Sequence, residues 1–303
     1  MELGGKDAAI LLDDVANLES IASILMRGVF QSAGQNCVGI ERIIALPTVY
    51  PRLIALLTPR IRALRQGDPL ANEEDVDVGA AISSAGFDEL EHLIADAVSR
   101  GARLLAGGTR YVNPKAPKGH YFAPTLLVDV TPSMPIASNE LFGPVCVVMR
   151  ASSVDDAIAI TNSTMYGLGC SVFGSKTADL QKVACEVSVG MVAINDFASY
   201  YVCGLPFGGV RGSGYGRFGG REGLRSLCNM KSVCVDRWPL MKTSIPPRLD
   251  YVITAKHGEM VGKGKGKGAK EMAWEFARGI VELGYGVGAR QRVEGLVKLV
   301  RNG

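Results

Sequence analysis

The fold is decided by residues 145–195, VCVVMRASSVDDAIAITNSTMYGLGCSVFGSKTADLQKVACEVSVGMVAIN. Short apolar runs alternate here with stretches of helical spacing. The pattern predicts strands and helices in turn, at 145–150, 154–162, 169–173, 178–187 and 191–195. Strands that alternate with helices pair in parallel through crossovers, and helices then cover both faces of the sheet. The segment therefore predicts an α/β fold with a mostly parallel sheet flanked by helices.

The same alternation extends toward the N-terminus. It predicts three helices and three strands, at 18–29, 50–65 and 87–98, and at 40–46, 103–106 and 125–130. Asp13 and Asp14 precede the first helix and Ser84 precedes the third, so all three are candidate capping residues.

Composition excludes several classes of protein. The 303 residues, 47% apolar and 21% charged, can bury a full core, which excludes general disorder. No run approaches the roughly 18 apolar residues of a spanning helix, and the N-terminus lacks a signal-peptide pattern. The seven cysteines are odd in number and form no C-x-x-C pair, so neither a disulfide framework nor a metal site is expected. We expect a cytoplasmic protein.

The net charge of +3 is concentrated near the C-terminus. Residues 256–301 contain ten Lys or Arg and five Asp or Glu, which leaves the rest near neutral. A near-neutral body argues against a nucleic-acid partner. Arg290, Arg292, Lys298 and Arg301 share a helical pattern with apolar residues. Such a helix either lies on an anionic membrane surface or packs on the body.

Two segments contain a candidate nucleophile and a candidate base. Cys37 follows a glycine-containing turn at 34–36, where exposed backbone N–H groups can stabilise a thiolate or an oxyanion. Glu2 precedes Gly4 and Gly5, and a carboxylate beside such a turn can act as a positioned base. Each residue alone also fits a plainer interpretation, because most single cysteines are buried and most glutamates are solvated.

Two further segments have the character of ligand-binding turns. Glu140 and Phe142 precede Gly-Pro at 143–144, where they either hold a sugar hydroxyl and pack on a ring or form a plain turn. A G-x-G-x-x-G pattern occurs at 214–219. No buried strand leads into that pattern, so it is not interpreted as a dinucleotide-binding fingerprint.

Taken together, the motifs resemble the aldehyde dehydrogenase superfamily. They are E-L-G-G-K at 2–6, G-Q-N-C at 34–37, N-E-L-F-G-P-V at 139–145, and P-F-G-G with S-G-Y-G-R within 206–217. Order and spacing both match, over roughly residues 1 to 235. The resemblance implies that a cysteine attacks an aldehyde, that hydride passes to NAD or NADP, and that a carboxylate activates the water that hydrolyses the thioester.

The resemblance also assigns roles to residues. Cys37 is implied as the nucleophile and Glu2 as the general base. Glu140 is implied to bind the nicotinamide ribose, while Phe142 and Leu3 lie beside the nicotinamide ring.

The resemblance further implies a substrate tunnel. Tyr200, Tyr201 and Cys203 lie in the segment 197–205 that would contribute to it, although a plain core loop is equally compatible with that segment. Asn195 corresponds to an asparagine that supports the site.

In the family a long segment precedes the E-L-G-G-K motif and builds most of the cofactor domain. The chain therefore resembles the C-terminal, catalytic portion, with the cofactor domain largely missing. We expect weak cofactor binding and impaired turnover. The resemblance divides the chain into a cofactor-domain remnant with a linking helix at 1–33, a catalytic domain at 34–210, a bridging and oligomerisation segment at 211–239, and a linker with a basic tail at 240–303. Residues 227–235 are expected to contribute a bridging strand.

Three functions remain open from the sequence. The first is aldehyde oxidation, with a small aldehyde as substrate. The second is cofactor-independent ester hydrolysis by Cys37. The third is a catalytically silent subunit that pairs with full-length chains. A homo-oligomer, or pairing with a full-length subunit, is expected from the resemblance.

Overall fold

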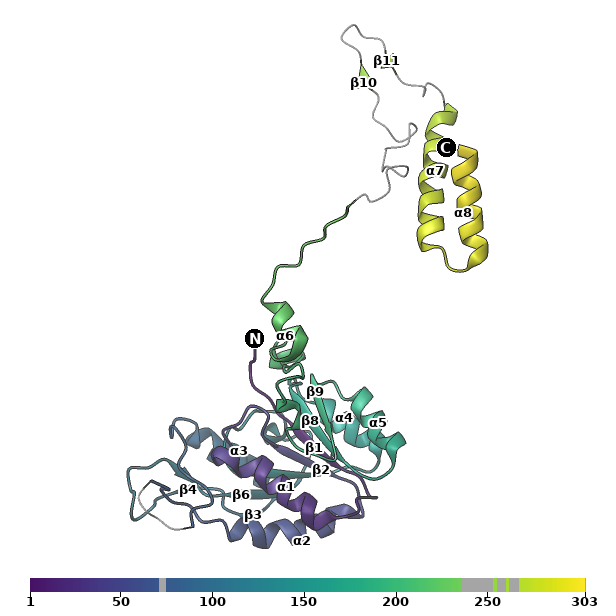
Figure 1. Cartoon of the computed structure of the whole chain (residues 1–303). Coiled ribbons are helices and arrows are strands. Elements are labelled where there is room, and N and C mark those ends of the chain that lie inside the picture. Colours follow the sequence, from purple (N-terminus) through teal and green to yellow (C-terminus); the bar gives the residue numbers. More distant parts are fainter. Residues whose placement is uncertain (71–74, 236–252, 255–259, 262–266, 303) are drawn as a thin grey trace. The chain divides into compact units, whose positions relative to one another are not determined.

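The computed structural model describes residues 1–70, 75–235, 253–254, 260–261 and 267–302 (Figure 1). The chain divides into two compact units, residues 1–229 and 230–303. This division differs from the predicted four parts, because residues on both sides of positions 33 and 210 belong to the first unit.

A seven-stranded sheet organises the first unit. Its strands are β1 (Ala8–Leu11), β2 (Arg42–Ala45), β3 (Arg103–Ala106), β6 (Thr125–Val130), β7 (Val145–Arg150), β8 (Gly169–Phe173) and β9 (Met191–Ile194). The strand order is β3-β6-β7-β2-β1-β8-β9, and every pair is parallel except the antiparallel pair of β3 and β6 at one edge. The predicted α/β fold with a mostly parallel sheet is confirmed.

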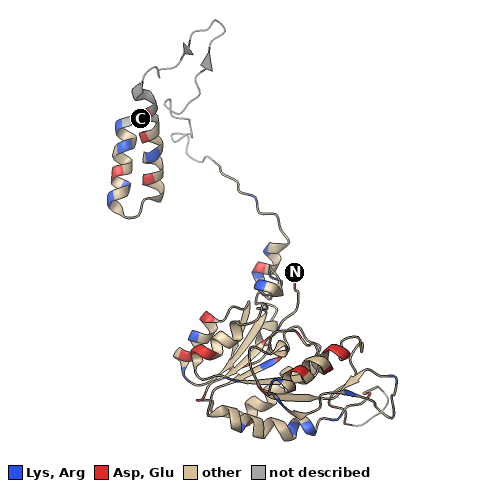
Figure 2. Cartoon of the chain, turned by 180° about the vertical axis from the view of Figure 1, so that it is seen from behind, with Lys and Arg blue, Asp and Glu red and all other residues tan. Residues whose placement is uncertain are grey.

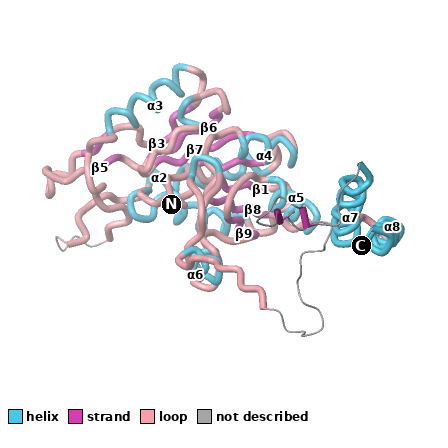
Figure 3. Tube along the Cα trace, turned by 90° about the horizontal axis from the view of Figure 1, so that it is seen from above, coloured by secondary structure: helices cyan, strands magenta, loops and turns pink. Residues whose placement is uncertain are grey.

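Helices cover both faces of this sheet. They are α1 (Leu18–Phe30), α2 (Val49–Arg62), α3 (Phe87–Ser99), α4 (Val154–Asn162) and α5 (Thr177–Glu186). Alternate residues of β1 face opposite sides, since Ala9 and Leu11 pack with α1 and α2, whereas Ala8 and Ile10 pack with α3, α4 and α5. Charged residues of both signs are interspersed along the helices (Figure 2), and the layers are visible from above in Figure 3.

Sequence analysis missed β1, an interior strand of this sheet. It has only four residues, all of them buried, and such a short apolar run carries no periodicity that separates strand from helix. Because β1 pairs with β2 on one side and β8 on the other, residues 8–11 are part of the domain that contains Cys37.

Asp13 caps a different helix from the one predicted. The N-cap of α1 is Asn17, whose side chain accepts a hydrogen bond from the Ser20 amide. The Asp13 carboxylate instead accepts from the backbone N–H of Thr48 at 2.9 Å and that of Val49 at 3.3 Å, at the start of α2. The predicted capping by Ser84 is also wrong, since the N-cap of α3 is Gly86 without a side-chain bond.

We expect Asp13→Ala to lower the free energy of unfolding by about 1–2 kcal/mol, the usual effect of losing an N-terminal cap. Thermal denaturation followed by circular dichroism measures this loss. Arg52→Ala, an exposed change on α2 itself, serves as the control and should leave the midpoint unchanged. Equal midpoints for Asp13→Ala and the parent chain would contradict the assignment of the cap.

The C-terminal part of the first unit differs from the predicted bridging strand. A short helix, α6 (Gly220–Ser226), is followed by exposed residues at 227–235 that adopt no strand. A strand forms only where a neighbour offers hydrogen-bonding groups, and none pairs with these residues in the described part of the chain. The bridging role of 211–239 stays a prediction.

The second unit contains a helical hairpin. It consists of α7 (Lys267–Tyr285) and α8 (Ala289–Asn302), and α8 contains the four basic residues for which the sequence predicts a helical pattern. Lys298 Nζ lies 2.6 Å from a carboxylate oxygen of Glu282, which ties the two helices together. Residues 240–252 of the predicted linker lie outside the described residues. Among the residues described, no helix is both long and apolar enough to cross a membrane.

Candidate active site

The turn before Cys37 is backbone-strained. Ser32, Ala33 and Gly34, at the end of α1, all adopt left-handed conformations, with φ of 57°, 55° and 72°. Non-glycine residues in this region are disfavoured by roughly 1–2 kcal/mol each, so the surrounding structure must hold them there. Strained turns of this kind cluster at functional sites, and this one presents Cys37 between α1 and β2.

The Cys37 side chain is half-buried beside a small apolar cluster. The cluster collects apolar side chains from the residue after Cys37, from the residue just before β8, from β9 and from the segment that follows β9. They are Val38, Leu168, Met191, Ala193, Tyr200 and Phe207. The sulfur is therefore accessible on one side and desolvated on the other.

Glu2 is held by the fourth motif. Residues 1–3 form a short antiparallel ladder with 213–215, in which Leu3 N donates to Ser213 O at 3.0 Å and Tyr215 N to Met1 O at 3.2 Å. Gly214 has φ of 111°, and a Cβ atom there would clash with the Met1 carbonyl. The S-G-Y segment thus fixes the backbone of the candidate base, which explains why two motifs far apart in sequence occur together.

The structure brings Glu2 and Cys37 together. Burial raises the pKa of the Cys37 thiol to about 12, and the neighbouring Glu2 carboxylate adds to this rise. The sulfur itself lies 3.9 Å from Asn36 Oδ1. A Cβ atom on Gly5 would clash with the Cys37 carbonyl, so glycine at this position allows the 2–6 segment to approach the cysteine closely. At neutral pH the thiol is protonated, and its attack on carbon requires a base to accept the proton.

We expect Glu2→Gln to lower the pKa of Cys37, because it removes a neighbouring negative charge that favours the neutral thiol. Alkylation by iodoacetamide follows the thiolate fraction. At pH 9 the Cys37 peptide, followed by mass spectrometry, should therefore react faster in the variant by about tenfold, the effect of one pKa unit. In both proteins the rate should rise with pH. A variant that alkylates no faster than the parent chain would contradict the contact.

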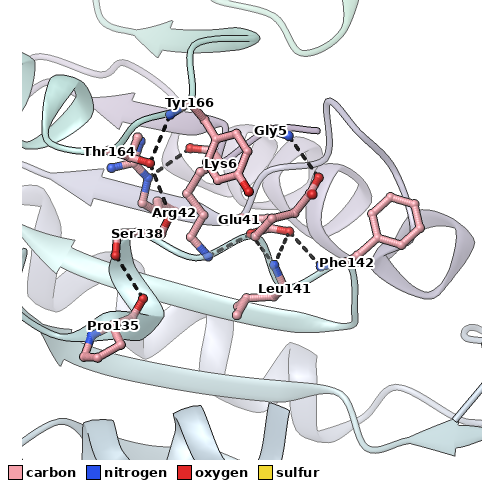
Figure 4. Close-up of polar contacts among 11 residues, drawn as sticks. Gly5, Lys6, Glu41, Arg42, Pro135, Ser138, Leu141, Phe142, Thr164 and Tyr166 are labelled. Carbon is pink, nitrogen blue, oxygen red and sulfur yellow. Dashed lines mark hydrogen bonds and ion pairs between the residues drawn. The ribbon is translucent and has the colours of Figure 1, made fainter. Parts of the chain in front are cut away.

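Glu140 and Phe142 lie at a second edge of the site. The half-buried Glu140 carboxylate accepts a hydrogen bond from Gly5 N at 2.9 Å, one residue before the buried Lys6. Burial raises the pKa of Glu140. Phe142 is 46% exposed, with φ of 48°, and Leu3 is 54% exposed. These residues offer a carboxylate with free lone pairs and two apolar surfaces, and Figure 4 shows the turn that contains Phe142.

Of the three predicted tunnel residues, Tyr200 and Tyr201 lie among the neighbours of Cys37, whereas Cys203 lines a different surface pocket. The Tyr201 hydroxyl donates to Asn36 Oδ1 at 3.0 Å, and Asn36 is adjacent to Cys37. Tyr200 is buried in the apolar cluster described above. Cys203 is exposed and lines a surface pocket with residues of α6, among which neither Cys37 nor Glu2 appears.

Asn195 has a local structural contact. It ends β9 with φ of 55°, its side-chain oxygen accepts from Gly174 N at 2.9 Å, and its own amide donates to Val172 O. Asn195 therefore links the C-terminal ends of β8 and β9 through hydrogen bonds.

Sequence analysis missed a set of buried charged residues behind the site. Lys6 and Glu41 form an ion pair of 2.7 Å, and Arg42 donates to three backbone carbonyls. Asp7 accepts from Gly169 N, while its other oxygen has no hydrogen-bond partner, and burial raises its pKa well above the usual range. Lys6 lies within the E-L-G-G-K motif, but nothing in a single sequence indicates its partner.

The residues present fit one end of a nicotinamide nucleotide. A carboxylate such as that of Glu140 can accept hydrogen bonds from ribose hydroxyls, and the exposed Phe142 and Leu3 side chains can contact a ring. For a metal ion, no group of three or more His, Cys, Asp or Glu side chains comes together in the part of the chain that the structure describes.

Comparison with known proteins gives consistent matches. The family model described as "Aldehyde dehydrogenase family" matches residues 1–233. A protein of Saccharomyces cerevisiae, named only as aldehyde dehydrogenase-like, is 51% identical over 303 residues, which is 99% of this chain and 45% of the yeast protein. A succinate-semialdehyde dehydrogenase [NADP(+)] of Mycobacterium tuberculosis is 34% identical over 235 residues, 78% of this chain and 50% of that protein.

Solved structures are similar over the same region. A betaine aldehyde dehydrogenase from Staphylococcus aureus, in complex with NAD+, superposes with a TM-score of 0.69 at 32% identity. The superposition covers 74% of this chain and 44% of that one. The chain spans about half the length of the curated relatives it matches.

Proposed function

This chain belongs to the aldehyde dehydrogenase family, and on that premise we propose that its protein oxidises an aldehyde to a carboxylic acid through a covalent intermediate on Cys37. The observation that carries the proposal is a half-buried thiol at the edge of an apolar cluster, with the Glu2 carboxylate near enough to raise the pKa of that thiol. Of the other cysteines in the described residues, Cys146 and Cys170 are buried within strands and the remaining four are exposed.

In the first half-reaction the Cys37 sulfur forms a bond to the aldehyde carbon while its proton passes to Glu2. The carbonyl oxygen becomes the oxyanion of a thiohemiacetal, which the backbone N–H of Cys37 can stabilise. A nicotinamide cofactor held by Glu140, Phe142 and Leu3 would supply the hydride acceptor, and loss of the hydride leaves a thioester on the sulfur. The strained turn at 32–34 holds the cysteine in place throughout.

Before the second half-reaction Glu2 releases to solvent the proton that it took from Cys37. Glu2 then removes a proton from water, and the resulting hydroxide attacks the thioester carbon. The carbon–sulfur bond breaks, the acid leaves, and the Cys37 thiolate recovers a proton. The high pKa of Cys37 favours recovery of the thiol at neutral pH.

Glu140, Phe142 and Leu3 are proposed to hold the cofactor at its nicotinamide end. The relatives include one named for NADP(+) and a structure solved with NAD+, so both cofactors belong in the assay. Tyr200 and Tyr201 are proposed to line the approach of the aldehyde, because one packs beside Cys37 and the other bonds to Asn36.

The C-terminal hairpin is proposed as an accessory surface rather than part of the reaction. The apolar side chains of α8 at Val293, Leu296 and Val300 are 59%, 49% and 80% exposed, in a helix that also contains Arg290 and Arg301. That combination suits weak contact with an anionic membrane surface. Flotation with phosphatidylserine vesicles, with and without residues 256–303, tests this contact, and equal recovery of both proteins in the soluble fraction rejects it. A homo-oligomer, or pairing with a full-length subunit, also remains a proposal.

The proposed function is tested by aldehyde-dependent formation of NADH or NADPH by the protein that carries this sequence. A panel of small aldehydes is assayed with each cofactor and compared with p-nitrophenyl acetate without cofactor. Reduction of the cofactor supports aldehyde oxidation. Ester hydrolysis alone favours a cofactor-independent thiol esterase, and neither activity favours a silent partner subunit.

A further inference from the structure

A buried carboxylate, Glu41, lies at the centre of the polar network shown in Figure 4. One of its oxygens pairs with Lys6 Nζ at 2.7 Å, and that side-chain amine is fully buried. Its other oxygen accepts from the backbone N–H of Leu141 at 3.0 Å and of Phe142 at 2.9 Å, and the Leu141 N–H lies equally close to the oxygen that pairs with Lys6. Three polar groups from two distant segments therefore converge on one side chain.

Glu41 joins the three segments that make up the candidate site. It follows Cys37 by four residues at the start of β2, and Lys6 follows Glu2 by four residues at the start of β1. The Leu141 and Phe142 amides directly follow Glu140. The Glu41 carboxylate, four residues after Cys37, thus holds the left-handed backbone of Phe142, whose φ is 48°.

A second carboxylate lies beside the Lys6 segment. Glu140 accepts from the backbone N–H of Gly5, the residue before Lys6, and its negative charge acts on Lys6 in addition to that of Glu41, to which Lys6 bonds. A buried ammonium group requires a partner, so loss of the Glu41 charge would leave Lys6 to pair with Glu140. Glu140 would then be neutralised and turned away from a ligand.

We propose that Glu41 is a positioning residue for the cofactor end of the site: it binds Lys6 and the 141–142 backbone, and so leaves the Glu140 carboxylate available to ribose hydroxyls. This inference rests on the proposed function, in which Glu140 contacts the nicotinamide ribose. Glu41 itself touches neither substrate nor cofactor.

The variant Glu41→Gln separates the two contacts of this residue. Its amide oxygen, in the position of Oε1, can still accept from the Leu141 and Phe142 N–H groups, although in the parent chain Leu141 N also lies 3.0 Å from Oε2. Its amide nitrogen cannot pair with Lys6. The double variant Lys6→Met/Glu41→Gln also removes the cation, so nothing then competes for Glu140.

The experiment measures the dissociation constants of NAD+ and NADP+ by titration calorimetry, using the full protein that carries this sequence. We expect Glu41→Gln to weaken binding about tenfold, as for losing one hydrogen bond to a charged group. The double variant should bind within about threefold of the parent protein, because Glu140 is free again. A purely structural ion pair predicts instead that the double variant binds no better than the single one.

Asp129→Asn is the matched control for stability. Asp129 accepts from Arg103, Arg150 and Tyr50 at β6, away from the segments of the site, so its loss should lower the melting temperature without changing cofactor affinity. If Glu41→Gln does not fold, the double variant decides: affinity like that of the parent supports the proposal, and weakened affinity overturns it. Failure of both to fold also overturns it, since the pair would then be a structural tie.

The outcome is separable from the proposed function. A parent protein without cofactor-dependent aldehyde oxidation rejects the proposed function. A parent protein that binds and reduces the cofactor, alongside a Glu41→Gln variant of unchanged affinity, rejects only the role of Glu41.

Discussion

Cys37→Ser should abolish aldehyde oxidation, with a fall in kcat/KM of about 10⁴-fold or more, the scale seen when a catalytic nucleophile is removed. The expected loss is large because the serine hydroxyl is a far weaker nucleophile than the thiol that it replaces. The oxygen is nearly isosteric with sulfur, so the apolar cluster beside it should pack as before. Initial rates of NADH and NADPH formation measure the effect.

Cys185→Ser is the matched control for this loss. Cys185 is a free and exposed cysteine in α5, so its replacement removes a thiol without touching the candidate site. It should retain the parent rate within about twofold. If Cys37→Ser kept more than a tenth of the parent rate, another group would have to form the covalent bond, and the mechanism would be wrong.

Glu2→Gln should produce a burst of cofactor reduction followed by slow turnover. The thioester still forms, since the thiol can lose its proton to solvent at alkaline pH, but no base activates the water that hydrolyses it. General base catalysis typically contributes about 10²–10⁴-fold, so the steady-state rate should fall by about 10³-fold while a burst of one equivalent remains. Stopped-flow absorbance at pH 9 resolves the two phases.

Glu89→Gln, an exposed change in the first turn of α3, controls for the loss of a negative charge and should turn over like the parent. A Glu2→Gln variant that loses the burst as well as turnover would assign Glu2 to the first half-reaction alone. A variant with parent turnover would remove Glu2 from the mechanism.

Many of the helices and strands could be predicted because each has its hydrophobic pattern within its own short stretch of sequence. The strands at 125–130 and 145–150 and the helices at 154–162 and 87–98 have sequence patterns long enough to distinguish strand from helix, and the structure contains all four. The four-residue β1 had no such signal, although it is an interior strand of the sheet. Residues 8–11 form a strand because they pair with β2 and β8, and no local sequence pattern shows this pairing.

The candidate catalytic and cofactor-binding residues could be predicted from the sequence, but the residues that hold them in place could not. Cys37, Glu2 and Glu140 stand in motifs whose spacing can be read from one sequence. The partners Asn36, Glu41 and Ser213 could not be predicted, because each acts on a segment at least 100 residues away in sequence. The left-handed turn at 32–34 also carries no signal at Ser32 and Ala33, since such conformations depend on tertiary contacts that override local preference.

The central claim is that Cys37 carries the acyl group, with Glu2 required for its release. The most direct test incubates the Glu2→Gln protein with an aldehyde and NAD+ or NADP+, quenches it with acid, and maps its peptides by mass spectrometry. We predict that the peptide containing Cys37 gains the mass of the acyl group and that the peptides of the other six cysteines do not. An unmodified Cys37 peptide after cofactor reduction, or an acyl group on another cysteine, would contradict the account.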